Sequence, residues 1–128
     1  MQVIWVAIGG ALGSVLRFLL QSRFQAAHGG SFPIGTLSVN LIGSLIIGFI
    51  AGWFLSAPFS NTLRIFLMVG VLGGFTTFSS FALENLNLLR AGNVKAALVY
   101  MLASNVIGIG LAWAGFAVSR LFARTGGV

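Results

Sequence analysis

The chain has no cysteine and very little charge. Only 6% of its 128 residues are charged, and Asp and Glu together contribute a single residue. Soluble domains carry about a quarter charged residues, so a surface built for water is excluded. The absence of cysteine excludes a disulfide framework and a thiolate metal site. We also find no acid pair, no nucleophile beside a base and no phosphate-binding loop, so the sequence predicts no enzyme.

Apolar residues dominate instead. They make up 58% of the chain, and the mean hydropathy is +1.05. The length matches four spans of about 20 residues with short connections. We therefore predict an all-α membrane protein with a single transmembrane domain, residues 1–128, and spans at about 3–20, 36–55, 63–89 and 95–122. The second span follows Pro33 and Gly35, and Thr36 is its expected N-cap.

The basic residues are scattered singly at the span ends. They give a net charge of +6 without any cluster, so we expect no nucleic-acid partner. They divide evenly between the two sides of a four-span protein: Arg64, Arg120 and Arg124 with the termini, and Arg23, Arg90 and Lys95 opposite. Cytoplasmic loops normally hold an excess of Lys and Arg, so this balance selects no orientation. We expect dual topology and an antiparallel homodimer, although the charge rule is a weak guide in so small a protein.

The third span is interrupted by Gly73-Gly74-Phe75-Thr76-Thr77. Two glycines followed by two β-branched residues make a poor helix centre. Irregular backbone at membrane depth is tolerated only when it is buried in protein or lines a wet cavity. A helix broken here would therefore mark a functional site. The pattern allows equally an intact helix whose glycines pack against a neighbour.

Small residues also repeat every four positions in the other spans. These stripes predict close helix packing in lipid. Their members are Gly9 and Gly13 in the first span, Ser44, Gly48 and Gly52 in the second, and Ser104, Gly108 and Ala112 in the fourth.

The polar residues inside the spans are mostly uncharged hydrogen-bond donors. They include Asn40, Ser44, Thr76, Thr77, Ser79, Ser80, Asn85, Asn87, Tyr100, Ser104 and Asn105. Hydroxyls and amides can solvate an anion without holding it too tightly, and conduction requires that compromise. The N-terminal end of a broken helix would attract an anion further. Phe78 and Phe81 share a helix face, and their positive ring edges suit an anion, although such a pair is more often a packing contact.

Glu84 is the only acid, and three environments are open to it. It can pair with Arg17, face water at the mouth of a vestibule, or simply lie at the membrane interface. His28 has no second ligand nearby, so we expect no metal site there.

The run from Gly73 to Phe81, GGFTTFSSF, resembles the signature of the small fluoride channels, the Fluc or CrcB family. The segments GSVLR at 13–17 and GTLSVN at 35–40, and Glu84 after the phenylalanines, are also similar to that family. The resemblance covers essentially the whole chain in length, span count and motif order.

This resemblance implies a fluoride-selective channel that passively exports cytoplasmic fluoride across the bacterial inner membrane and protects against fluoride toxicity. It also implies an antiparallel homodimer with two pores, each built from both copies. The implied pore residues are Phe78, Phe81, Asn40, Thr77, Ser79, Ser80, Tyr100 and Ser104, with Arg17 and Glu84 in a vestibule or electrostatic role. The family's structural sodium ion would lie at the dimer interface on the backbone carbonyls of Gly73 and Thr76. Two hydroxyls found in family members are absent here, at Ala82 and Gly108.

Two other functions compete with this interpretation. A small multidrug transporter also has four spans and dual topology, but it needs a carboxylate in the membrane, commonly in its first helix, where this chain has Arg17. A four-span assembly subunit without a pore would explain the glycine stripes but not the hydroxyl-rich third span.

Overall fold

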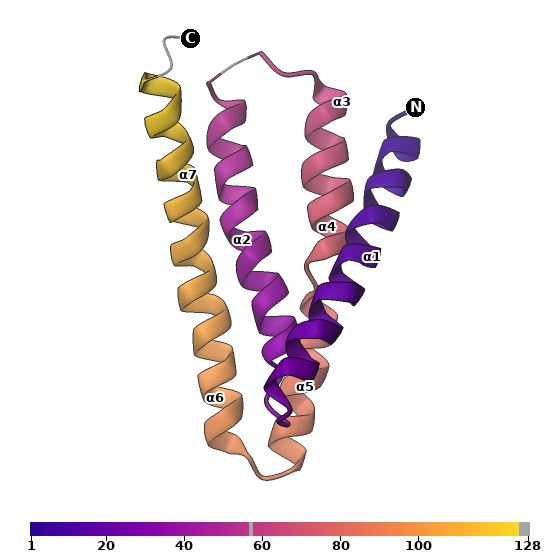
Figure 1. Ribbon diagram of the computed structural model, residues 1–128, viewed down its shortest axis with the longest axis vertical. Helices are drawn as coiled ribbons and strands as arrows, with labels where there is room; N and C mark the ends of the chain where they lie inside the picture. Colours follow the sequence, from indigo (N-terminus) through magenta and orange to yellow (C-terminus); the bar gives the residue numbers. More distant parts are fainter. Residues whose placement is uncertain (57, 126–128) are drawn as a thin grey trace.

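Four long helical spans make up the computed structural model, which describes residues 1–56 and 58–125 (Figure 1). Residues 57 and 126–128 of the predicted domain lie outside this description. The first two spans are α1 (Gln2–His28) and α2 (Ile34–Phe54). Within the described residues, four helices are long and apolar enough to cross a membrane. This confirms the predicted all-α membrane fold.

The third and fourth spans are each built from several helical pieces. The third consists of α3 (Asn61–Arg64), the π-helix η1 (Ile65–Val71), α4 (Leu72–Phe75) and α5 (Phe78–Arg90). The fourth consists of α6 (Val94–Leu102), the π-helix η2 (Ala103–Ile107) and α7 (Gly108–Thr125). Helical π turns often occur at functional sites, so the third and fourth spans are candidate locations for one.

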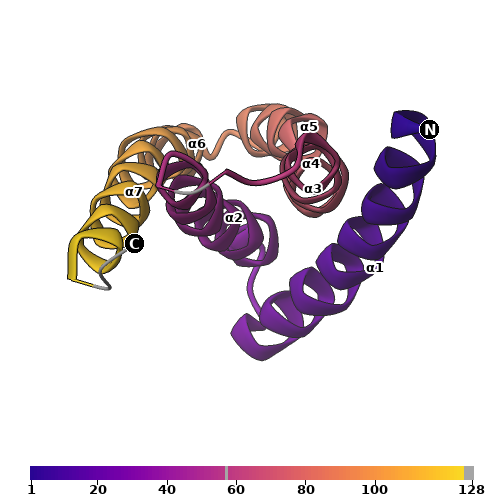
Figure 2. The ribbon, with the colours of Figure 1, turned by 90° about the horizontal axis from the view of Figure 1, so that it is seen from above.

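The spans run alternately up and down, so both termini lie at one end of the molecule (Figure 1). The α1–α2 and α5–α6 connections lie at the other end. Seen from above, α2 and α7 run side by side, while α1 crosses at the outside of the bundle (Figure 2). This arrangement places three basic residues near each end, as the sequence predicts.

Glycine ends two of the helices at the loop end. Gly29 after α1 and Gly92 after α5 have φ angles of 66° and 77°, which only glycine adopts without strain. Helix α1 continues well beyond the expected span, to His28. Gln25 supports this extension, because its amide bonds the carbonyls of Gly30 and Phe32 in the following loop.

Close backbone contact holds the spans together. A Cβ atom added at Gly48 on α2 would collide with the backbone carbonyl of Ala112 on α7. One added at Gly13 on α1 would collide with the carbonyl of Val71 in η1. Helices in lipid associate by such contacts because apolar burial gives them little driving force. The small-residue stripes are therefore packing surfaces, as predicted.

Much of the apolar surface is not covered by the chain itself. Phe18 is 69% exposed, Phe78 79% and Trp113 74%. The small buried core, formed by Leu37, Leu88, Ala97 and Tyr100, packs α2 against α5 and α6. Such surfaces suit lipid or another protein chain rather than water.

The third span is broken between α4 and α5. Thr76 has φ −90° and ψ 157°, and Thr77 has φ −147° and ψ 121°, so both residues are extended. The break confirms the first of the two interpretations of the glycine–threonine run and excludes an intact helix.

Candidate functional site

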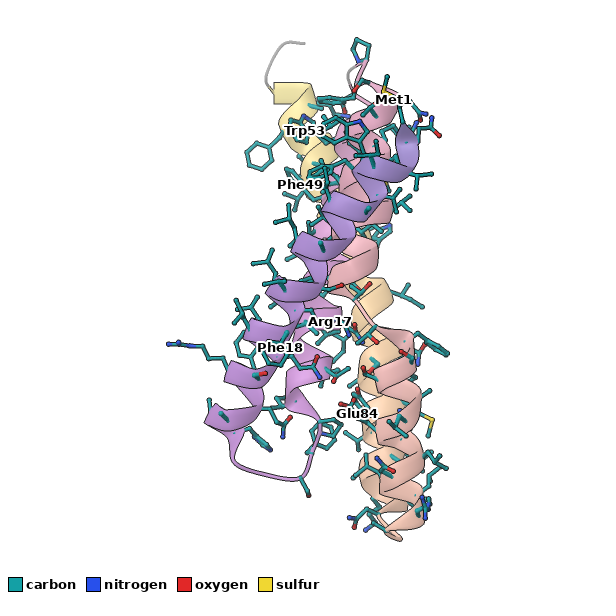
Figure 3. All side chains as sticks on the ribbon, turned by 90° about the vertical axis from the view of Figure 1, so that its right-hand side faces the viewer. Met1, Arg17, Phe18, Phe49, Trp53 and Glu84 are labelled. Atoms are coloured by element: carbon teal, nitrogen blue, oxygen red, sulfur yellow. The ribbon has the colours of Figure 1, made fainter. Side chains whose placement is uncertain are left out.

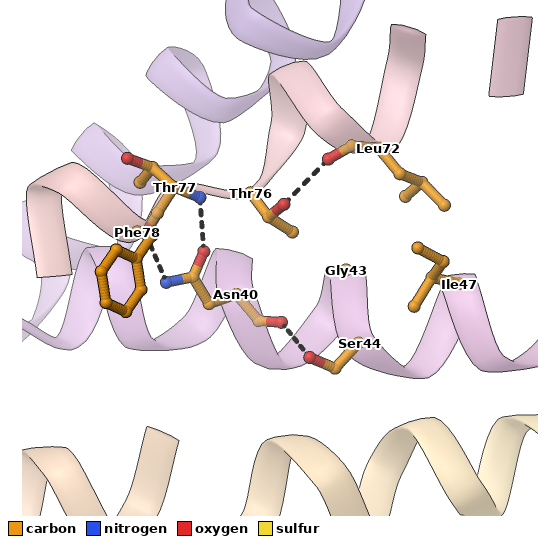
Figure 4. A pocket seen from close by; sticks show the side chains of 8 residues that line it. All are labelled: Asn40, Gly43, Ser44, Ile47, Leu72, Thr76, Thr77 and Phe78. Atoms are coloured by element: carbon orange, nitrogen blue, oxygen red, sulfur yellow. Dashed lines mark hydrogen bonds between the residues drawn. The ribbon is translucent and has the colours of Figure 1, made fainter. Parts of the chain in front are cut away.

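Asn40 on α2 holds the break in the third span open. Its side-chain oxygen accepts a hydrogen bond from the Thr77 backbone N–H at 2.8 Å, and its amide donates to the Thr77 carbonyl at 3.0 Å (Figure 4). Unpaired backbone groups are costly in a membrane, so this pair of bonds stabilises the extended conformation.

The break deprives backbone carbonyls of their helical donors, those of Gly73 and Thr76 among them. In a continuous α-helix the Thr77 N–H would donate to the Gly73 carbonyl, and the Ser80 N–H to the Thr76 carbonyl. Here the first N–H donates to Asn40, and the second donates to the Thr77 hydroxyl at 3.2 Å. The carbonyls of Gly73 and Thr76 have therefore lost these two donors.

Arg17 on α1 occupies a third carbonyl at the break. Its Nε donates to the Gly74 carbonyl at 3.1 Å. The guanidinium charge thus lies beside the C-terminal end of α4, where a cation is favoured. Arg17 and Glu84 lie at different levels of the bundle (Figure 3).

Hydroxyl groups gather at the N-terminus of α5. The Thr77 hydroxyl caps this helix and lies 3.3 Å from the Ser79 oxygen and 3.2 Å from the Ser80 oxygen. The positive end of the helix macrodipole points into the same region. The sequence-predicted polar residues Asn40, Thr77, Ser79 and Ser80 are therefore brought together.

Two phenyl rings follow the hydroxyl groups on α5. The ring centres of Phe78 and Phe81 are 5.6 Å apart with an angle of 40° between their planes. Phe81 is half-buried and lies 5.1 Å from the ring of Tyr100 on α6, whereas Phe78 projects from the surface. Phe78 thus presents its ring where an ion or another chain can meet it.

A cavity of about 270 Å³ lies between α2 and the break (Figure 4). Its lining combines polar and apolar side chains: Asn40, Gly43, Ser44, Ile47, Leu72, Thr76, Thr77 and Phe78. None of these residues is charged. The hydroxyls of Ser44 and Thr76 donate to the carbonyls of Asn40 and Leu72, at 2.8 and 2.9 Å. An anion in this cavity would meet uncharged polar groups, which hold it less tightly than a fixed positive charge would.

Glu84 is held by hydroxyl groups from two other spans. Thr36 on α2 donates to its Oε1 at 2.6 Å, and Tyr100 on α6 donates to its Oε2 at 2.6 Å. Glu84 also borders two cavities, of about 240 and 310 Å³, which share Ser31 and Pro33 in the α1–α2 connection. Of the three environments considered for Glu84, these contacts agree with water at the mouth of a vestibule, which stays a prediction.

Ser104 lies in η2, one turn after Tyr100 along the fourth span. Its buried hydroxyl oxygen has no hydrogen-bond partner among the described residues. At Gly108, a Cβ atom would lie 3.5 Å from the Ser44 oxygen. The fourth span therefore presents an unused hydroxyl at Ser104 and space for one at Gly108.

Sequence reasoning missed two residues of this site. Thr36 is not the N-cap of α2, since the helix begins at Ile34 and the Thr36 hydroxyl bonds Glu84 instead. Gln21 donates to that same hydroxyl at 3.0 Å. Its signal was a polar residue one turn after Arg17 on the same helix face.

The fold and the site together define a class: an integral membrane protein of four spans, with uncharged polar groups gathered at a broken helix. The sequence model of the family described as "CrcB-like protein, Camphor Resistance (CrcB)" matches residues 4–116. The chain belongs to this family.

Similar proteins from bacteria agree with this assignment. The chain is 46% identical to a Magnetococcus marinus protein over 124 residues, covering 94% of this chain and 99% of the relative. It is 49% identical to a Thermus thermophilus protein over 111 residues, covering 87% of this chain and 89% of the relative. Both relatives are named "Fluoride-specific ion channel FluC".

Proposed function

We propose that this protein is a fluoride channel that lets cytoplasmic fluoride leave the cell passively across the bacterial inner membrane. The family assignment and the names of the relatives support this function. The observation that supports it in the structure is the uncharged, partly polar cavity at the helix break, bordered by Phe78.

The pore residues we propose share the ability to replace the hydration shell of a small anion. They are Phe78, Phe81, Asn40, Thr77, Ser79, Ser80, Tyr100 and Ser104. Hydroxyl and amide protons and the positive edges of the phenyl rings would contact fluoride in turn. A narrow passage would exclude chloride, which is larger. Arg17 and Glu84 would act at the break and at the vestibule, respectively.

The working unit we propose is an antiparallel homodimer of two oppositely inserted copies. The even division of basic residues between the two ends supports dual insertion. Phe78 is 79% exposed, and an exposed pore ring needs a second wall. A second copy would supply that wall, so each pore would be built from both chains.

A structural sodium ion is the cofactor we propose. The carbonyls of Gly73 and Thr76 have lost their helical donors, and hard oxygen ligands of this kind suit an alkali cation. The two residues from each copy would hold the ion at the dimer interface. The ion would neutralise the clustered carbonyl dipoles there.

Liposomes that contain the purified protein test the function directly. We expect fluoride release at a fluoride electrode and no release of chloride in the matched measurement. Phe81→Ile should abolish the flux while the protein still elutes as a dimer. Normal conduction by both Phe78→Ile and Phe81→Ile would refute the pore assignment, and liposomes that retain their fluoride would refute the function.

A further inference from the structure

One chain of hydrogen bonds links all four spans through the only acid. Gln21 on α1 donates from Nε2 to the Thr36 hydroxyl on α2 at 3.0 Å. That hydroxyl donates to Oε1 of Glu84 on α5 at 2.6 Å. The Tyr100 hydroxyl on α6 donates to Oε2 at 2.6 Å. Both oxygens of the carboxylate are therefore fixed, each by a different span.

The chain continues as contacts between aromatic rings. The Tyr100 ring is fully buried and contacts both Phe81 and Phe32, with ring centres 5.1 and 5.7 Å away. Phe81 in turn contacts Phe78 at 5.6 Å. The Glu84 carboxylate is thus connected to Phe81 through the hydroxyl and the ring of Tyr100.

We propose that Gln21 and Thr36 are positioning residues for the phenylalanine wall of the pore. This inference rests on the proposed function. The Thr36 hydroxyl donates its one proton to Glu84 while its oxygen accepts from Gln21, and successive bonds in such a chain strengthen one another. Neither residue lines the cavity at the break, although Gln21 borders the cavity of about 310 Å³ beside Glu84. Both would act on the phenyl rings through Glu84 and Tyr100. Helix α1 thereby influences the geometry of rings that it does not contribute.

Flux measurements with matched variants test the inference. Thr36→Val keeps the side-chain shape and removes the hydroxyl, and we expect fluoride flux to fall by about tenfold, since bonds to charged groups are the stronger ones. Thr36→Ser should restore most of the flux, and Gln21→Leu should lower it by about threefold. Thr62→Val and Gln2→Leu, at exposed positions, serve as controls and should leave flux unchanged.

Tyr100 supplies a readout that does not depend on fluoride. It is the only tyrosine, so a ¹³Cζ-tyrosine label gives one resonance that reports on the bond to Glu84. We expect this resonance to shift in Thr36→Val and Gln21→Leu and to stay in place in the two controls. An unmoved resonance, or full flux in either test variant, would overturn the inference. If Thr36→Val does not fold, Gln21→Leu decides by the same criteria. Failure of the unmodified protein to release fluoride would refute the function and with it the role in a pore, whereas the resonance, read without fluoride, tests the bond chain by itself.

Discussion

Asn40 provides the sharpest test of how the helix break is held. The variant Asn40→Leu keeps a side chain of similar size but removes both bonds to the Thr77 backbone, at 2.8 and 3.0 Å. The Thr77 N–H is then free to donate to the Gly73 carbonyl, as it would in a continuous helix. We therefore expect the break to lose its open conformation in a large fraction of molecules.

The size of the effect follows from the two bonds. A side-chain hydrogen bond in a membrane protein contributes about 0.6 kcal/mol on average and up to about 1.7 kcal/mol. Losing both therefore destabilises the break by about 1–3 kcal/mol, which corresponds to roughly a fivefold to hundredfold change in the conformational equilibrium. Asn40→Asp should keep the bond from the Thr77 N–H but place a negative charge beside the Thr77 carbonyl and in the path of an anion.

The assay combines fluoride release from liposomes with thermal unfolding in detergent. Asn40→Leu should lower both the flux and the unfolding temperature, and Asn40→Asp should lower the flux further. Asn105→Leu is the matched control, because Asn105 is exposed and its amide donates to the Met101 carbonyl of its own span. Unchanged flux and stability in Asn40→Leu would show that the break does not depend on this residue.

Three further predictions concern packing, insertion and the cation. Gly48→Ala should destabilise the fold strongly because its Cβ would meet the Ala112 backbone, whereas Gly110→Ala, with no atom within 4 Å, should unfold at the same temperature as the unmodified protein. In the cysteine-free chain, Asn93→Cys should react with an impermeant thiol reagent from both sides of the membrane; labelling from one side only would refute dual topology. Replacing sodium by N-methylglucamine should lower thermal stability and flux together, and unchanged values would refute the structural ion.

Composition and periodicity were enough to predict the fold class. A chain with 6% charged residues and four long apolar runs has to cross a membrane as helices, because lipid cannot bond an open backbone. The break was predicted as one of two possibilities from the glycine–threonine run. The stripes of small residues predicted which helix faces pack closely, since only small side chains allow backbones to meet.

The tertiary structure decided which polar groups meet. Arg17 was one possible partner of Glu84, yet it bonds the carbonyl of Gly74, 57 residues away in the chain. Thr36 was expected to cap its own helix, yet it bonds Glu84, 48 residues away. Sequence patterns report the face of a helix on which a residue lies. Its partner depends on the crossing and register of separate helices, which are set by backbone contacts such as that between Gly13 and Val71. The four-span bond chain from Gln21 to Tyr100 therefore became visible only in three dimensions.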